Sequence, residues 1–417
     1  MVRTLREWLH ALAAVLATFL TMLCTAALGL AAAGATALPA GAFPRVVLAT
    51  VVAALGGTVT LDGHAGDLAG SRGDLTVMPL SVALAGALVL AAAFRRHAPG
   101  THPGAYAARI LALWLPALLT VSLTAHHTFT VPLGEGTLGD LGEILGLSPE
   151  IGFTTDVPVT VLLGLVWAVG VLALTALASR ALPLPRPLVA ARPVAYAMVG
   201  LLLVCLAVGA VIGLVVAATR GHPARTLAVL LLGLPNVVWP VFTLGLGARW
   251  DGRVDGPFGL PMPRLLDEVL RTPEVSTLDL GALARHDGRV WWLVVVDAVL
   301  VLSAGYAAAL RSPVRLPLWR HAVRTGLALA VTVLAVCAVC RISAHYGLSL
   351  IGVGDLGGGL SGVLFLRPRV WPAVGLALAW GLAGGLLGGL AARRVRASAG
   401  GRARRAPFLP HGGGKGS

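Results

Sequence analysis

One carboxylate stands inside an apolar run that is long enough to cross a bilayer. Asp297 lies in the stretch WWLVVVDAVLVL, roughly two helical turns from its start at about 1.5 Å per residue. A charge at that depth is expensive, so it should face a helix bundle or a wet cavity and either pair or be protonated. We expect its partner to be Arg341, at the end of the next apolar run. Such a pair is either a helix–helix contact or a site that couples a proton or a substrate.

A second candidate is an amide beside a proline. Asn236 is the only asparagine of the chain and follows Pro235 in the apolar stretch Thr226–Ala248. Proline removes a backbone donor and ends or kinks a helix near the preceding residue. Backbone groups freed at membrane depth need partners in protein or in a water-filled cavity. Pro235 and Asn236 therefore mark either a kinked spanning helix or the lining of a pathway for a substrate or an ion.

Acidic residues of the loops form a third, weaker candidate. They stand in glycine-rich, turn-like sequences, where a carboxylate can bind a cation together with backbone carbonyl oxygens. Turn and N-cap chemistry explains the same pattern more simply. The residues concerned are Asp62, Asp67, Asp140, Asp251 and Asp355.

No motif of an enzyme or of a cofactor site occurs in the chain. Cys337-x-x-Cys340 lacks the second ligand pair of a zinc site, and all four cysteines lie in apolar runs. A Ser-His-Asp set, a metalloprotease helix, a phosphate-binding loop and a dinucleotide-binding fingerprint are all missing from the sequence. We therefore expect no catalytic activity, no cofactor and no metal.

Composition places these candidate residues in a membrane. The chain is 57% hydrophobic and 12% charged, with a mean hydropathy of +0.86, which is far outside the soluble range. Its long apolar runs can cross hydrocarbon as helices, and the alternating strands of a membrane barrel are absent. The net charge of +14 does not indicate a nucleic-acid partner, because the basic residues lie between and after these runs. The sequence predicts an all-α, polytopic helical membrane protein.

Charge decides which of the apolar runs span. If all of them crossed, the acidic loop His126–Asp156 would be cytoplasmic and several arginine clusters would be outside, against the positive-inside tendency. The conflict disappears if Val46–Leu61 and Thr226–Ala248 enter and leave on the outer side, with Pro235 and Asn236 at the tip of the second. Eight helices then span and both termini are cytoplasmic. The expected spans are Leu9–Ala33, Val77–Phe94, Ile110–Ala125, Val157–Ser179, Val194–Ala218, Trp291–Leu310, Ala322–Cys340 and Val370–Ala392.

With this topology the chain folds one pattern twice. The first membrane half covers residues 1–180 and the second covers 193–394; residues 395–417 read as a disordered, basic cytoplasmic tail suited to anionic lipid headgroups. Leu55-Gly56 and Leu61-Asp62-Gly63 match Leu244-Gly245 and Trp250-Asp251-Gly252 at identical spacing. Four crossings per half make the halves parallel, and interrupted segments at matching places of two halves point to a transport site.

Two long stretches of the second half carry a family resemblance. They are GLPNVVWPVFTLGLGARWDGRVDGPFGLPMPRLLDEVLRTPEVSTLDLG and GLSLIGVGDLGGGLSG, and the layout extends to GGTVTL and VMPLSVALAGAL near the front. The chain resembles the streptophobe family, large hydrophobic proteins of streptomycetes and their relatives. The resemblance implies a multi-pass protein of an actinobacterial cytoplasmic membrane, and it assigns no functional residues.

Two functions from different classes fit these observations. We expect a permease for a small molecule or an ion, built from two parallel halves whose broken segments line an outward-facing cavity. The alternative is a non-transporting scaffold whose outer loops and basic tail bind partners or lipid. A polar-lined cavity that reaches Asn236 or Asp297 would favour transport, whereas a fully packed bundle would favour the scaffold.

Overall fold

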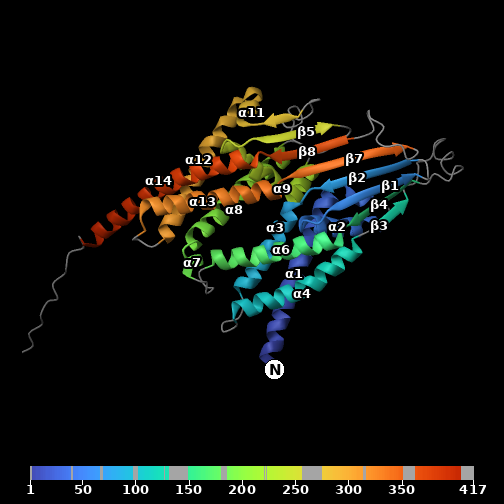
Figure 1. Cartoon of the computed structure of the whole chain (residues 1–417), viewed down its shortest axis with the longest axis horizontal. Coiled ribbons are helices and arrows are strands. Elements are labelled where there is room, and N and C mark those ends of the chain that lie inside the picture. The colour runs from blue at the N-terminus through green and yellow to red at the C-terminus, as the bar shows by residue number, and fades with distance from the viewer. Residues whose placement is uncertain are drawn as a thin grey trace, which may run out of the picture.

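A bundle of helices with a sheet on one side of it makes up the protein (Figure 1). The computed structural model describes residues 2–38, 41–65, 69–96, 102–125, 127–130, 149–179, 186–219, 221, 223–255, 275–312, 316–350 and 362–404. In Figure 1 the strands extend to the right of the helices. We call the helix ends next to the sheet the sheet end. The opposite ends, where Arg95, Arg192, Arg311 and Arg393 lie, are the basic end.

The same order of elements occurs twice along the chain. The first half consists of α1 (Val2–Ala32), α2 (Ala42–Ala54), β1 (Val59–Ala65), β2 (Ala69–Thr76), α3 (Leu80–Arg95), α4 (Pro103–Thr124), β3 (His127–Thr130), β4 (Pro149–Thr155) and α6 (Val157–Ala178). The second consists of α8 (Arg192–Thr219), α9 (Pro223–Gly245), β5 (Trp250–Asp255), β6 (Ser276–Leu278), α12 (Trp292–Arg311), α13 (Leu318–Val339), β7 (Ile342–Leu350), β8 (Gly362–Pro368) and α14 (Val370–Arg404). Short helices connect these elements: η1 (Ala35–Ala37), α7 (Arg186–Val189), α11 (Leu280–His286) and η2 (Gly288–Trp291).

Eight helices within the described residues are long and apolar enough to cross a membrane, which confirms the multi-pass helical class. The set differs from our prediction in one exchange: α9 is included and α3 is not. α9, which contains the stretch Thr226–Ala248, meets the length and apolarity conditions. α3, in the expected span Val77–Phe94, has only 16 residues, or about 24 Å at 1.5 Å per residue. The helix is short because β2 occupies the chain up to Thr76.

An eight-stranded sheet lies beyond the sheet end, in the order β3-β4-β1-β2-β7-β8-β5-β6. All seven neighbouring pairs are antiparallel. The all-α class describes the membrane bundle, and the sheet is an addition that we did not predict. Glycines and charges interrupt its strands, as in the β2 sequence AGSRGDLT, and so remove the apolar alternation by which a strand is recognised.

Strand pairing repeats between the halves. In the first half β1 pairs with β2 and β4, and β4 pairs with β3. In the second half β5 pairs with β6 and β8, and β8 pairs with β7. All four hairpins belong to one sheet, so they lie on the same side of the bundle. The halves are therefore parallel, as predicted.

A matching turn gives the correspondence between the halves. Gly56 after α2 and Gly247 after α9 have left-handed φ angles of 96° and 95°. In both turns the N–H of the next residue, Gly57 or Ala248, donates a hydrogen bond of 3.0 Å to the carbonyl five residues earlier. This is a Schellman-type helix end, which favours glycine. In the sheet, Val59 is the first residue of β1 and Trp250 is the first residue of β5, so these two positions correspond. Gly56 thus corresponds to Gly247 and not to Gly245, and our sequence match was two residues off because Leu-Gly pairs recur in this chain.

The two halves meet in both layers. β2 and β7 pair over eight residues, from Ala69 opposite Leu350 to Thr76 opposite Ser343. In the bundle, α9 packs against α1 and α3, and α8 contacts α6. Each half nevertheless keeps its own apolar core. The junction is therefore made by a strand pair in the sheet and, in the bundle, chiefly by α9, with a smaller contribution from α8.

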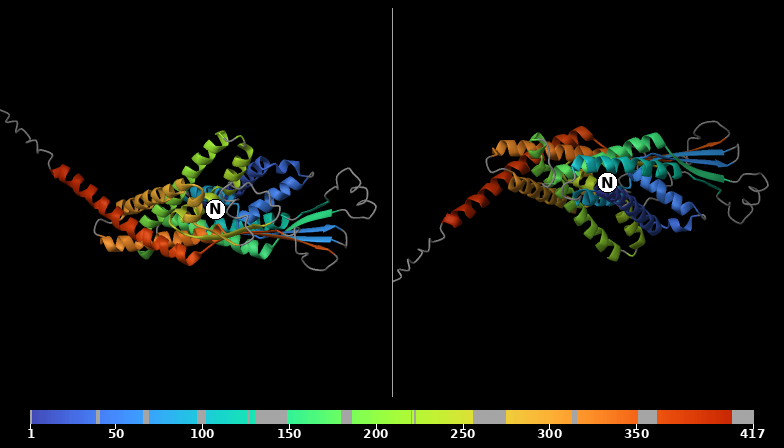
Figure 2. Two further views of the ribbon diagram at one scale, coloured as in Figure 1. Left: turned by 90° about the horizontal axis from the view of Figure 1, so that it is seen from above. Right: turned by 90° about the horizontal axis from the view of Figure 1, so that it is seen from below.

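α9 turns back along α8. Gly213 of α8 lies against Leu230, and Gly209 lies against Val238, so the two helices run antiparallel. Figure 2 shows them in yellow-green as a pair that stands out from the body. The chain reverses in the short connection between α8 and α9, so the predicted hairpin with Pro235 at its tip does not form.

The break within α9 is a kink. Backbone geometry departs from helical at Gly233 (φ −136°, ψ 18°), and the helix continues through Pro235 and Asn236. The contacts of α9 with Gly29 of α1 and Leu80 of α3 lie near the sheet ends of those helices. The kinked α9 therefore contacts the first half near the sheet end.

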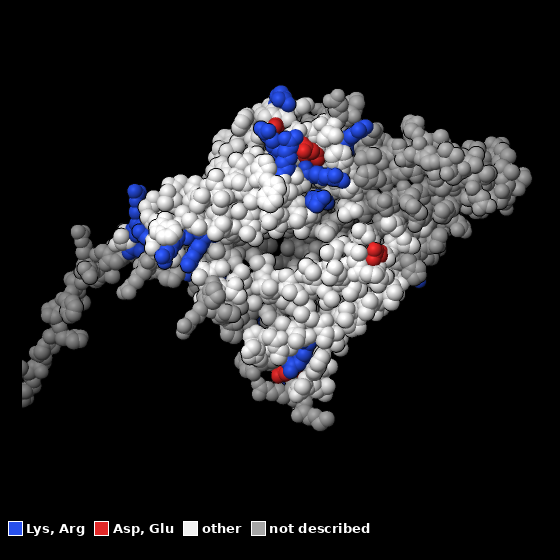
Figure 3. Space-filling model, in the orientation of Figure 1, with Lys and Arg blue, Asp and Glu red and all other residues white. Residues whose placement is uncertain are grey.

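Charge is distributed unevenly over the surface (Figure 3). Blue side chains gather at the basic end of α13 and α14, whereas blue and red mix around α11 and β5. Helix α14 continues to Arg404, so residues 395–404 of the predicted disordered tail are helical, in keeping with the helix propensity of alanine and arginine. The remainder of that tail, 405–417, lies outside the described residues.

Candidate functional site

Asp297 is buried in the second half, where no described residue pairs with it. The residue is 3% exposed, and its carboxylate lies against Gly245 of α9, where any side chain would overlap it. Cys205 of α8 is close enough to interact with it electrostatically. Oδ2 has no hydrogen-bond partner among the described residues. Packing, and not pairing, therefore holds this carboxylate, which is a costly arrangement at membrane depth.

The predicted ion pair between Asp297 and Arg341 is wrong. Arg341 follows Cys340, the C-cap of α13, and its side chain is exposed at the sheet end. No ion pair joins these two described residues. α14 packs against both α12 and α13, whereas those two helices contact each other directly at few places. The prediction failed because helices that are consecutive in the chain need not be neighbours in the bundle.

Asn236 bonds the second half to the first. Its Oδ1 accepts the N–H of Leu80 at 3.1 Å, and its Nδ2 donates to the carbonyl of Met78 at 2.9 Å. Leu80 is the first residue of α3, whose own N-cap residue, Pro79, supplies no side-chain bond. The first N–H groups of a helix have no partner within the helix. The amide of Asn236 thus caps a helix of the other half, and both of its polar atoms are used.

Ser81 fills the break in α9. Its hydroxyl donates to the carbonyl of Leu230 at 2.9 Å and accepts the N–H of Leu234 at 3.0 Å. In an unbroken helix these two backbone groups would bond to each other, so the hydroxyl is inserted into the ladder. Pro235 is buried beside it, with its carbonyl facing the thiol of Cys340. We call the bonds made by Asn236 and Ser81 between α3 and α9 the inter-half joint.

The structure does not assemble the predicted pathway residues into one site. Asn236 faces α3, whereas the position that touches Asp297 is Gly245, nine residues further along α9 (236 to 245). That separation is about 13 Å along a helix. Pro235 belongs to the joint, and the side chain of Arg341 is exposed and bonds to neither Asn236 nor Asp297.

Asp251 of β5 is bound by protein groups. Its two carboxylate oxygens accept hydrogen bonds from Nε of Arg369 at 3.1 and 2.9 Å, and one also accepts the hydroxyl of Thr277 at 3.1 Å. The bond from Arg369 lowers the pKa of Asp251, and burial opposes this effect. This carboxylate therefore ties β5, β6 and the start of α14 together. Of the other predicted loop acids, Asp62 lies on β1, and the remaining three lie outside the described residues: Asp67, Asp140 and Asp355.

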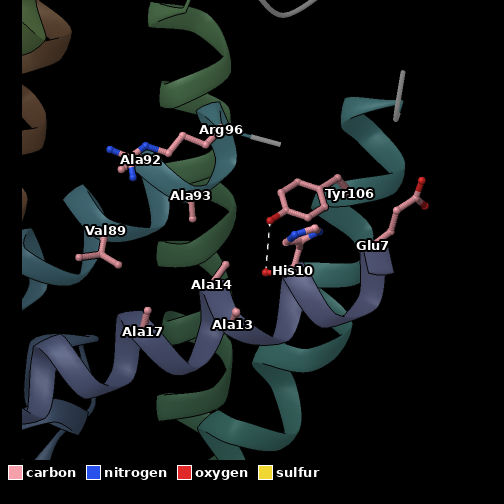
Figure 4. Close-up of a pocket in the computed structure, with 10 residues that line it drawn as sticks. All are labelled: Glu7, His10, Ala13, Ala14, Ala17, Val89, Ala92, Ala93, Arg96 and Tyr106. Carbon is pink, nitrogen blue, oxygen red and sulfur yellow. Dashed lines mark hydrogen bonds between the residues drawn. The ribbon is translucent and has the colours of Figure 1, made fainter. Parts of the chain in front are cut away.

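A cavity that the sequence did not reveal lies at the basic end of the first half, between α1, α3 and α4. Its volume is about 500 Å³. Figure 4 shows small side chains of α1 and of α3 on the two sides of the space. The lining residues are Glu7, His10, Ala13, Ala14 and Ala17 of α1, Val89, Ala92, Ala93 and Arg96 at α3, and Tyr106 of α4.

Polar groups stand only at the basic end of this cavity. Glu7 forms an ion pair with Arg109 at 2.7 Å, and the Tyr106 hydroxyl donates to the carbonyl of His10 at 3.5 Å (Figure 4). The guanidinium of Arg96 has no protein partner within the described part of the chain. Neither Asn236 nor Asp297 lines the cavity. The cavity and the inter-half joint are therefore separate features.

Comparison with known proteins adds no relative, since no family model, no curated protein and no solved structure matches the chain. The resemblance to the streptophobe family stays a prediction. The helices, and not a relative, identify the class: this is a multi-pass helical membrane protein with a sheet on one side of its bundle.

Proposed function

We propose that this protein is a non-enzymatic, non-transporting membrane scaffold that holds its eight-stranded sheet outside the membrane as a binding platform. The observation that carries the proposal is the double connection between the halves. They are joined in the sheet by the β2–β7 pair and in the bundle by the inter-half joint. The arginine-rich basic end and the positive-inside tendency favour cytoplasmic termini and an outer sheet.

Rigid connection of the halves argues against the usual transport cycle. Transporters built from repeats work largely by rocking one half or bundle against the other around a central site. Rocking here would strip Asn236 from α3, pull the Ser81 hydroxyl out of α9 and strain the β2–β7 ladder. Each buried polar group left without a partner costs about 1–3 kcal/mol, so the joint opposes such a motion.

The polar candidates are also engaged or enclosed by protein groups. Asn236 uses its amide within the joint, and Asp297 is 3% exposed. The cavity in the first half lies beside neither of them. By the criterion of a polar-lined cavity that reaches one of these residues, the geometry supports the scaffold.

A proton-coupled permease is the second candidate, and one observation favours it. Oδ2 of Asp297 is buried and has no partner among the described residues, which is the state expected of a carboxylate that exchanges a proton. In this case Asp297 would couple the flux, and the substrate would be a small molecule or an ion.

Solute flux separates the two candidates. Purified wild type and Asp297→Asn would be reconstituted into proteoliposomes loaded with a pH-sensitive dye. Proton leak and osmotic swelling in a panel of small solutes would then be recorded. The scaffold predicts rates equal to those of protein-free vesicles for both proteins. Flux by wild type that Asp297→Asn abolishes would contradict the scaffold and support the permease.

Photocrosslinking tests the platform directly. A photoreactive amino acid at Val275, an exposed position just before β6, should form discrete adducts with outer partners in intact cells. The control position is Val395, which is similarly exposed but lies at the basic end of α14. Equal adduct patterns at both positions, or none at Val275, would speak against the platform.

A further inference from the structure

We propose that the cavity between α1 and α3 binds one anionic glycerophospholipid of the leaflet at the basic end. Its acyl chain would lie between the small side chains of α1 and α3, and its phosphate would contact Arg96. The site differs from the basic tail at 395–417, where we predicted contact with lipid headgroups. It also does not depend on whether the protein is a scaffold.

The shape of the cavity suits a hydrocarbon chain. Alanines at positions 13 and 17 face alanines at 92 and 93, so the walls carry almost no side-chain volume (Figure 4). Ala13, Ala17 and Ala92 are exposed on the surface of the bundle, so the space opens toward the surrounding lipid. Its volume of about 500 Å³ is typical of sites for small molecules. An apolar space that opens into a bilayer is filled by lipid chains, because no other solvent reaches it.

The charge at the end of the cavity selects the headgroup. Glu7 is neutralised by its ion pair with Arg109, whereas the guanidinium of Arg96 has no protein partner within the described residues. Arginine binds phosphate through charge-assisted, often bidentate hydrogen bonds. Arg96 follows the last residue of α3 at the basic end, which is the depth of the lipid phosphates. An anionic headgroup therefore fits this end better than a zwitterionic one.

The second half shows what the same place looks like without a ligand site. α12, which corresponds to α3, also ends on an arginine, but the guanidinium of Arg311 stacks on the Tyr196 ring of α8 at 3.3 Å. On another face α12 packs backbone to backbone on α14, with Gly305 against Gly384. At the basic end, the terminal arginine of α12 is thus bound to an aromatic ring, whereas Arg96, one residue past the end of α3, has no partner within the described residues.

Native mass spectrometry with defined lipids tests the proposal. Delipidated full-length protein would be titrated with phosphatidylglycerol, phosphatidylcholine or a free fatty acid, and the number of retained lipids would be measured. The variants are Arg96→Ala, which removes the cation, and Ala17→Phe, which fills the exposed wall. Matched controls are Arg95→Ala on the same turn of α3 and Leu16→Phe on the exposed face of α1, because neither residue lines the cavity.

We expect wild type and both controls to retain one phosphatidylglycerol more tightly than phosphatidylcholine. Arg96→Ala should weaken phosphatidylglycerol about fivefold or more, to the level of phosphatidylcholine, as expected for one arginine near the headgroups. Ala17→Phe should abolish retention of both lipids. Equal retention by wild type and Arg96→Ala, or equal retention of fatty acid and phosphatidylglycerol, would overturn the proposal. Arg96→Ala alters no packing, so its result stands even if Ala17→Phe fails to fold.

Discussion

The two halves share one order of elements and differ in how their helices pack. The first half is held by large side chains: Trp114 lies 4.6 Å from Phe19 and 5.4 Å from Trp167 between ring centroids, and its indole N–H donates to the carbonyl of Gly164 at 3.1 Å. Large side chains keep backbones apart and leave the alanine-lined cavity beside α1. The first half is therefore the half with room for a ligand.

The helices of the second half pack closely against one another through glycines. Gly305 of α12 touches the backbone of Gly384 on α14, and Gly381 of α14 touches Gly326 of α13. His321, buried on α13, adds a hydrogen bond between its Nε2 and the carbonyl of Gly305 at 3.1 Å. The two halves thus share the turns and the strand pairing, and among the described residues the aromatic-packed half is the one that carries the alanine-lined cavity.

The largest effect should come from adding a methyl group to a glycine contact in the second half. Gly305→Ala places its Cβ on the backbone of Gly384, which cannot move aside, and should cost about 3 kcal/mol. Gly164→Ala in the first half meets only the side-chain atoms of Leu118 and should cost about 1 kcal/mol. Gly375→Ala on α14 meets open space and is the control. Unfolding of the purified variants in nanodiscs would measure all three, and equal losses at 305 and 164 would refute the contrast.

Substitutions that break the inter-half joint should cause the second-largest loss of stability. Asn236→Ala leaves the N–H of Leu80 and the carbonyl of Met78 without partners, and Ser81→Ala does the same to Leu230 and Leu234. Each should lower the free energy of unfolding by about 1–3 kcal/mol. The same nanodisc measurement applies, with Thr332→Ala on α13 as a control that removes only a hydroxyl bonded within its own helix. If the two joint variants lost no more stability than Thr332→Ala, the joint would not hold the halves together.

Substitution of Asp297 should change the free energy of unfolding less, and one substitution should leave it unchanged or raise it. Asp297→Asn keeps the shape and replaces a buried carboxyl group, which has no partner among the described residues, with a neutral amide, so the variant should be as stable as wild type or more so. Asp297→Ala also opens a gap next to Gly245 and should cost about 1–2 kcal/mol. A large loss in Asp297→Asn would reveal a partner of the carboxylate that the described residues do not supply.

The smallest effect concerns the sheet and depends on pH. The pKa of Asp251 is lowered in the folded protein, chiefly by its bond from Arg369, so this carboxylate binds fewer protons folded than unfolded. Its stabilisation is complete above the ordinary aspartate pKa and is lost as pH falls through the lower folded value. Melting curves of wild type and Asp251→Asn should therefore differ slightly at neutral pH and converge in acid. A constant difference across this range would contradict the linkage.

Sequence reasoning succeeded where one physical signal dominates. Long apolar runs predicted the helices and the class of protein. The asymmetry of charge predicted parallel halves, which the structure shows. It failed where the outcome depends on neighbours in space. Arg341 is not the partner of Asp297 because α12 and α13 pack mainly against α14 and little against each other. Nothing near Leu234 in the chain predicted that the Ser81 hydroxyl would bond to it. Strands rich in glycine and alanines on two distant helices carry no periodic signal, so the sheet and the cavity were missed.

The central claim, that the halves do not move against each other, can be tested by a distance measurement across them. Spin labels at Arg95→Cys in the first half and Arg320→Cys in the second report from the basic end, where rocking would change their separation most. Both positions are exposed, and the exposed native Cys24 would be replaced by serine. In nanodiscs, double electron–electron resonance should give one narrow distance distribution that is the same at pH 5.5 and pH 8. A second population, or a shift between the two pH values, would contradict a rigid scaffold.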